Sequence, residues 1–196
     1  MYSAKFEKEL IKEKDIVQII CIMDGSGSMY PIIAECVGAF NKFVDSQKKL
    51  KGDAELTLVA FDEDKKIVYD KVNIQEVGTL DEFDVFLGGS TALYDAIGLA
   101  LKNADDDKKT ICLIQTDGHE NASQEYKANT IKDLIKEKEA LGWEFIFIGA
   151  GIDAFEEGKM FGLKAHQTRS IAATGQGISN YGGIITSEVT DFRKKV

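Results

Sequence analysis

Three short, largely apolar runs dominate the hydrophobic pattern of the chain. They cover residues 16–23, 110–116 and 143–148, and in the first run Gln18 is the one polar side chain. Apolar runs of this length, without alternation, are typical of central parallel strands that helices cover on both faces. We therefore predict three buried parallel strands at these positions.

The segments between and after these runs carry apolar residues at helical spacing, with one face turned inward. Ser123 is the predicted N-cap of the helix after the second run, and Asp153 caps a short helix after the third. A C-terminal helix is predicted from the apolar stripe Ile178, Tyr181, Ile185, Val189 and Phe192. The helices before it are predicted over residues 31–49, 80–86, 92–103, 123–141 and 153–162.

Three weaker strand patterns complete the predicted sheet. Residues 55–61 and 67–72 predict an antiparallel hairpin, joined by the polar turn 62–66, with its second strand at an edge. Residues 163–168 are predicted as the last strand. Residues 1–14 are interpreted as a charged extension in which Phe6, Leu10 and Ile11 would share one face of a helix. The pattern indicates a single α/β domain over residues 15–196, with helices on both faces of the sheet.

Length and composition limit the classes of function. The 196 residues suffice for one domain that buries about 70% of its unfolded surface. The formal charge of −9 argues against binding nucleic acid through its phosphates and against adsorption to an anionic membrane. No segment approaches the roughly 18 apolar residues of a membrane span, and no signal-peptide core opens the sequence. We expect a cytoplasmic protein with buried free thiols at Cys21, Cys36 and Cys112.

Polar residues follow two of the predicted buried strands directly. Asp24-Gly25-Ser26-Gly27-Ser28 comes after the first run, and Asp117 comes after the second. Ligands of open α/β sheets bind outside the carboxyl ends of the strands, where the strand order reverses, so these two ends are candidates for neighbouring positions. Carboxylate and hydroxyl oxygens suit a hard cation, and Mg²⁺ takes about six oxygens at about 2.1 Å. The sequence therefore predicts a Mg²⁺ site at this edge, with Mn²⁺ or Ca²⁺ as alternatives.

Three separated motifs resemble those of the von Willebrand factor A domain, which also occurs as the inserted domain of integrins. They are DGSGS at 24–28 for the family's DxSxS, Thr91 within GGSTALYDAI, and Asp117 within QTDGHEN. The resemblance spans about residues 15–192. It implies a doubly wound, mostly parallel six-stranded sheet with one antiparallel edge strand. It also implies a metal-ion-dependent adhesion site (MIDAS) made by Asp24, Ser26, Ser28, Thr91 and Asp117.

In such a site the serine and threonine hydroxyls bind the cation, and the two aspartates hold its waters or bind it directly. Neutral hydroxyl ligands leave the cation with residual positive charge, which increases its attraction for an external anion. We therefore expect a metal-dependent protein-binding module, not an enzyme, whose cation captures an Asp or Glu carboxylate of a protein partner. The alternatives are a metal-dependent hydrolase or phosphotransferase that uses the same cation, and a scaffold in which the metal is purely structural.

Several of these features have competing interpretations. Ser26 and Ser28 would also serve as caps of the following helix, and Asp117 would also begin an ordinary turn. The DxDxT motif of haloacid-dehalogenase-like phosphatases is similar, but Ser26 stands where that family has its second carboxylate. The glycine motif at 149–154 lacks the acidic partner of a dinucleotide site and is interpreted as a strand exit.

Residues near the predicted site are candidates for its rim. His119 is either a rim residue or a solvated loop residue, and the acidic turn 62–64 either shapes the rim or is a solvated hairpin. Tyr30 and Tyr94 either frame the ligand cleft or pack in the core. The glycine-rich segment 175–183 would permit the last helix to move on ligand binding, as it does in integrin-type domains.

Overall fold

The structure is a computed structural model that describes residues 15–86 and 88–195. The helix predicted for Phe6, Leu10 and Ile11 lies outside the described residues. Within the described part of the chain, every helix is too short or too polar to cross a membrane.

A six-stranded sheet forms the centre of the protein, in the order β3-β2-β1-β4-β5-β6. β3 is antiparallel to β2 at one edge, and every other neighbouring pair is parallel. The predicted fold class, with its single antiparallel edge strand, is confirmed. The strands are β1 (Val17–Asp24), β2 (Ala54–Phe61), β3 (Lys65–Asn73), β4 (Thr110–Thr116), β5 (Glu144–Ala150) and β6 (Thr168–Ile171).

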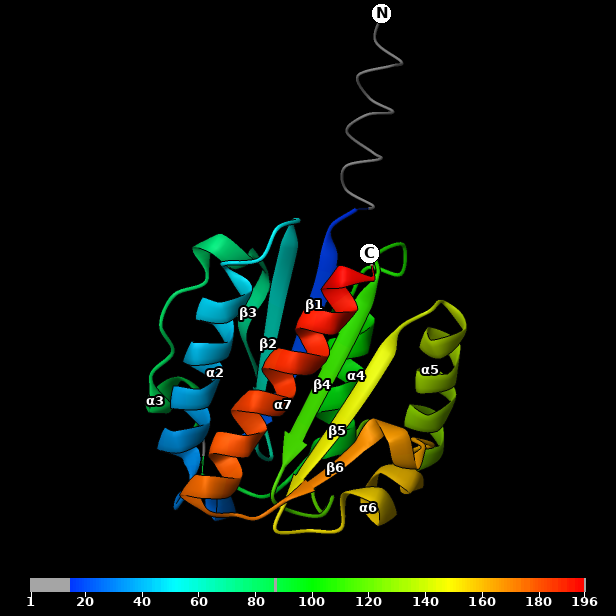
Figure 1. Cartoon of the computed structure of the whole chain (residues 1–196). Coiled ribbons are helices and arrows are strands. Elements are labelled where there is room, and N and C mark those ends of the chain that lie inside the picture. The colour runs from blue at the N-terminus through cyan, green and yellow to red at the C-terminus, as the bar shows by residue number, and fades with distance from the viewer. Residues whose placement is uncertain (1–14, 87, 196) are drawn as a thin grey trace, which may run out of the picture.

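Helices cover both faces of this sheet (Figure 1), and two hydrophobic clusters result. α2 (Ile33–Gln47), the short α3 (Glu82–Val85) and α7 (Gly175–Lys194) contribute to one cluster. α4 (Leu93–Asn103), α5 (Ala128–Ala140) and α6 (Ala154–Met160) contribute to the other. The stripe predicted for the C-terminal helix is buried at all five positions, which confirms that helix.

β1 lies at the centre of the sheet, contributes to both clusters and is buried at all eight of its residues. Ile19 packs in the cluster under α2 and α7, whereas Ile20 packs in the cluster under α4 and α5. The polar side chain near its start, Gln18, is satisfied by the Thr110 hydroxyl at 2.8 Å and the Asp105 amide at 3.0 Å. The continuous apolar run of β1 therefore reflects a strand without a solvent face.

The predicted free thiols are confirmed, since Cys21, Cys36 and Cys112 are unpaired and buried. Burial raises the pKa of Cys21 and of Cys36 to about 12, so these thiols stay protonated at neutral pH.

Two predicted elements begin about five residues later than expected, and the other bounds agree within a few residues. The helix predicted from Ser123 begins only at Ala128, because the amides before it bind the Asp95 carboxylate instead of continuing a helix. The strand predicted over 163–168 is β6 at Thr168–Ile171, and Ala165–Gln167 form a 3₁₀ turn that Gln167 closes by accepting a bond from the Lys164 amide.

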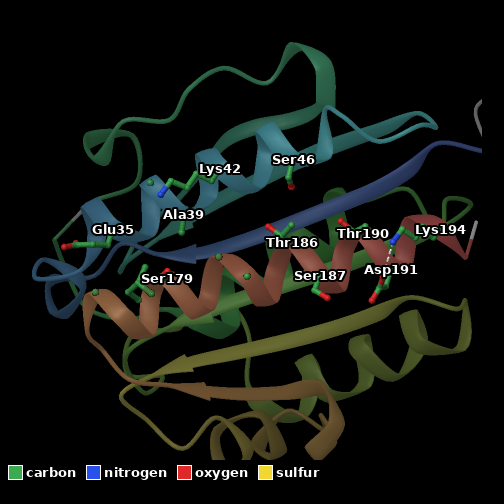
Figure 2. A pocket seen from close by; sticks show the side chains of 15 residues that line it. Glu35, Ala39, Lys42, Ser46, Ser179, Thr186, Ser187, Thr190, Asp191 and Lys194 are labelled. Atoms are coloured by element: carbon green, nitrogen blue, oxygen red, sulfur yellow. Dashed lines mark ion pairs between the residues drawn. The ribbon is translucent and has the colours of Figure 1, made fainter.

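A groove of about 770 Å³ lies between α2 and α7, and Figure 2 shows the side chains that line it. The lining is mostly small, with Gly38, Ala39, Ser179 and Gly182 among its residues. A Cβ added at Gly182 would lie 3.2 Å from the Ala39 Cβ, so the two helices approach closely there. None of the residues that line this groove is a predicted metal ligand.

A matched pair of helix glycines tests the packing of α4 against Tyr126. A Cβ at Gly98 of α4 would lie 2.5 Å from the Tyr126 ring, whereas a Cβ at Gly38 of α2 meets nothing within 4 Å. Gly98→Ala should lower the free energy of unfolding by about 1–3 kcal/mol through overpacking. Gly38→Ala should raise it by roughly 0.5–1 kcal/mol, because alanine loses less backbone entropy in a helix. Urea unfolding of both variants measures the difference, and equal stability of the two would contradict the described contact.

Candidate metal site at the carboxyl edge of the sheet

The predicted ligands gather where neighbouring strands end. Asp24 is the last residue of β1, and Asp117 follows the last residue of β4, its neighbour in the sheet. Thr91 lies two residues before α4, at the end of the loop that follows α3. The prediction that the β1 and β4 ends are adjacent is confirmed, and the strand order reverses there as in other doubly wound sheets.

The Asp24 side chain is completely buried beneath the site. Its Oδ1 accepts a hydrogen bond from the Ser26 amide at 2.8 Å, and its Oδ2 accepts one from the Thr116 hydroxyl at 2.5 Å. Burial raises the pKa of the Asp24 carboxyl, against the effect of these hydrogen bonds, and the nearby charge of Asp117 adds to the rise. A buried carboxylate with a raised pKa is one that a bound cation would stabilise.

The hydroxyls of Ser26 and Ser28 lie beside Asp117. The two Oγ atoms are 3.2 Å apart, and the Ser28 hydroxyl donates to the Asp117 Oδ1 at 2.6 Å. Neighbouring ligands of an octahedral Mg²⁺ at about 2.1 Å are about 3.0 Å apart, so these separations fit one coordination shell. Ser26 is buried and Ser28 is exposed, so the group opens to solvent on the Ser28 side.

The Thr91 hydroxyl lies on the other side of Gly118 from the Ser28 hydroxyl. A Cβ added at Gly118 would lie 3.3 Å from the Thr91 Oγ1 and 3.9 Å from the Ser28 Oγ, so both hydroxyls face the same small volume. Glycine at 118 leaves that volume clear. All five predicted residues thus lie at one edge of the sheet, while their role as metal ligands stays a prediction.

Backbone hydrogen bonds hold the two loops of the site together. The Gly27 amide donates to the Gly89 carbonyl and the Gly88 amide donates to the Gly25 carbonyl, each at 3.0 Å. Asp62 secures the second loop, because its Oδ2 accepts from the Gly89 amide at 2.9 Å. The acidic turn therefore helps to shape the rim through Asp62, which is buried, whereas the following residues Glu63 and Asp64 are exposed.

The donor set is suited to a hard cation. It consists of two carboxylates and three hydroxyls, all oxygen. Over residues 15–86 and 88–195, no three His, Cys, Asp or Glu side chains cluster in a way that could hold a metal ion. The hydroxyls are therefore what distinguishes this edge as a candidate metal site.

The other rim candidates differ in their surroundings. His119 is exposed, and its Nδ1 lies 2.5 Å from the Glu157 Oε2 of α6. Tyr94 packs in the core beneath α4. Tyr30 is 73% exposed, and its ring lies 5.7 Å from the Phe86 ring. His166 lies in the 3₁₀ turn before β6.

Two residues of the site were not predicted from the sequence. Thr116 binds the Asp24 carboxylate, and the signal for it is a hydroxyl at the end of a buried strand, directly after Gln115, which pairs with Met23. Asn121 accepts a hydrogen bond from the Thr91 amide at 2.8 Å, and its place four residues after Asp117 gave no periodic signal.

No protein-family model and no curated protein matches the sequence. Among solved structures, proximal thread matrix protein 1 from the mussel byssus, with a zinc-occupied MIDAS motif, is 18% identical. The match covers 87% of this chain and 47% of that chain, with a TM-score of 0.61. A von Willebrand factor type A structure from Catenulispora acidiphila is 16% identical over 89% of this chain and 42% of that chain, with a TM-score of 0.59. BatB from Bacteroides thetaiotaomicron is 15% identical over 91% of this chain and 99% of that chain, with a TM-score of 0.60.

The chain spans about half the length of the mussel protein and nearly all of BatB. At these identities the likeness concerns the arrangement of the backbone. In this chain that arrangement is the six-stranded sheet with one antiparallel edge strand and helices on both faces. The chain therefore has the fold of a von Willebrand factor type A domain, as the three motifs predicted.

Proposed function

We propose that this protein is a metal-dependent protein-binding module. Its cation, Mg²⁺ with Mn²⁺ or Ca²⁺ as alternatives, would be held by Ser26, Ser28 and Thr91, with Asp24 and Asp117 beside it. The observation that carries the proposal is the contact of the Ser28 hydroxyl with both Ser26 and Asp117, above the buried Asp24 carboxylate. The zinc-occupied MIDAS motif named for the mussel protein supports a divalent cation in this fold.

The chemistry that the cation would supply is electrophilic attraction of a partner's carboxylate. Two aspartates of the chain position the groups that would hold the cation. Asp24 fixes the turn of the first loop through the Ser26 amide, and Asp117 orients the Ser28 hydroxyl. Because the ligating side chains are mostly neutral, the partner's Asp or Glu would complete the balance of charge. The open side at Ser28 is where that group would arrive.

Asp24→Asn tests the cation without disturbing the fold. The amide would keep the bond from Ser26, and its Nδ2 would donate to the Thr116 hydroxyl, whose proton has a second acceptor in the Gly118 carbonyl at 3.1 Å. Mg²⁺ at 100 times its Kd should stabilise the wild type by about 2.7 kcal/mol and should leave Asp24→Asn unchanged. Asp45→Asn, the same charge change on the exposed face of α2, should respond to Mg²⁺ as the wild type does.

The pKa of Asp24 determines whether Asp24→Asn is more or less stable than the wild type in chelator. Burial raises this pKa above its unfolded value, so the charged carboxylate destabilises the metal-free protein at neutral pH, and this cost is relieved as the pH falls through the raised value. Asp24→Asn should therefore be at least as stable as the wild type in chelator at neutral pH, with the difference closing at lower pH. An unfolding curve of the wild type that no divalent cation shifts would contradict the proposal.

An aromatic pair, the exposed Tyr30 and the partly buried Phe86, flanks the candidate site. Tyr30 follows the first loop directly, and Phe86 precedes the loop that contains Gly88. Since the Gly88 amide binds the Gly25 carbonyl, the pair lies beside the proposed ligands. Aromatic residues are enriched in protein interfaces, where they supply much of the binding energy. We expect this pair to contact the partner next to its carboxylate.

Tyr30→Ala should weaken partner binding about tenfold without changing Mg²⁺ affinity or stability, because the side chain is 73% exposed. The measurement is quantitative capture of proteins from native lysate of the source organism, in Mg²⁺ and in chelator. Leu141→Ala removes a comparably exposed apolar side chain at the far end of α5 and should have no effect. Equal capture by wild type and Asp24→Asn would contradict protein binding through the cation, and metal-dependent phosphatase turnover lost in Asp24→Asn would favour the hydrolase alternative.

A further inference from the structure

The loop between β4 and α5 caps the first turn of α4. Helix N-termini leave amides without partners within the helix, and here side chains from a distant loop accept them. The acceptors lie within three residues of one another in the loop. They are Asn121 for the Thr91 amide at 2.8 Å, Glu120 for the Tyr94 amide at 2.9 Å and Ser123 for the Asp95 amide at 3.1 Å.

Asp95 of α4 in turn accepts hydrogen bonds from the same loop. Its carboxylate is 3% exposed and accepts hydrogen bonds from the consecutive amides of Gln124, Glu125 and Tyr126, at 2.8 to 3.0 Å. Burial would raise the pKa of Asp95, but these amides and the Lys65 ammonium lower it below its ordinary value. The carboxylate is therefore charged in the folded protein, and the loop and the helix fix each other.

Asn121 is the residue of this loop whose side chain binds the backbone of a predicted metal ligand. Its Oδ1 accepts from the Thr91 amide, and its own amide donates to the Thr91 carbonyl at 3.0 Å. Thr91 is thus held at both of its backbone polar groups by a residue only four positions after Asp117. The segments that carry these two predicted ligands are joined directly, with no cation needed to bring them together.

We infer that Asn121 is a positioning residue for the cation. The inference rests on the proposed function. Asn121 fixes the Thr91 backbone so that the Thr91 hydroxyl faces Ser28 across Gly118. Binding a cation to ligands that are already in place spends little free energy on ordering the loops. Loss of the Asn121 side chain leaves the amide of Thr91, a buried residue, without this acceptor. The Thr91 carbonyl keeps the backbone bonds from the Asn121 and Ala122 amides, so Thr91 is loosened at its amide.

Three variants test the inference. Asn121→Ala removes the acceptor, Asn121→Asp keeps an oxygen in the same position, and Gln124→Ala changes an exposed side chain in the same loop. Titration calorimetry with Mg²⁺ measures affinity, and amide hydrogen exchange at Thr91 in chelator measures the contact without any metal. We expect Asn121→Ala to weaken Mg²⁺ binding 10- to 100-fold, as is typical for residues that orient metal ligands, and to speed exchange at Thr91. Asn121→Asp should stay within a few-fold of the wild type, and Gln124→Ala should match it.

The outcomes separate this inference from the proposed function. Mg²⁺ binding by the wild type with unchanged affinity in Asn121→Ala would overturn the inference and leave the proposed function standing. Absence of Mg²⁺, Mn²⁺ and Ca²⁺ binding by the wild type would overturn both. Asn121 is exposed, so Asn121→Ala should fold. If its unfolding in chelator is not cooperative, Asn121→Ser, whose shorter side chain also withdraws the acceptor, is measured with the same two outcomes.

Discussion

The charge of Asp24 is the constraint on which this edge of the protein depends. A carboxylate that is fully withdrawn from water at the end of the central strand must be balanced by hydrogen bonds or by an opposite charge. The Ser26 amide and the Thr116 hydroxyl balance it in part, and its pKa remains raised. A divalent cation above it would supply the rest. The position of Asp24 thus ties the stability of the fold to the chemistry of the site.

The buried carboxylates of Asp95 and Asp24 differ in how well their charges are balanced, and they therefore have different roles. Three backbone amides and Lys65 satisfy Asp95, so its charge is stable without any ligand, and it serves the loop that carries Asp117. Asp24 has fewer donors and lies where the strand order reverses, which is the position at which doubly wound sheets bind ligands. One carboxylate therefore orders the site, and the other is available to a cation.

Most of the fold could be predicted from the pattern of apolar residues in the sequence. β1 and α7 were predicted because burial on both faces, or along one stripe, leaves a regular pattern of apolar residues. The start of α5 was missed because the amides of Gln124 to Tyr126 bind Asp95, some 30 residues away, and such a contact leaves no periodic trace. Thr116 and Asn121 were not predicted as site residues, because their contacts with Asp24 and Thr91 also join distant parts of the sequence. The five candidate ligands were named from the three motifs of the resemblance, and the structure places them near the ends of β1 and β4 and before the start of α4.

The most direct test of the account is a crystal structure of the protein grown with Mn²⁺, read through its anomalous density. We predict one ion at the carboxyl edge of the sheet, bonded to the hydroxyl oxygens of Ser26, Ser28 and Thr91 at about 2.2 Å, with a coordination position open toward Ser28. An ion bound elsewhere on the chain, or a Thr91 hydroxyl too far from the serines to share it even through one water, would contradict the account.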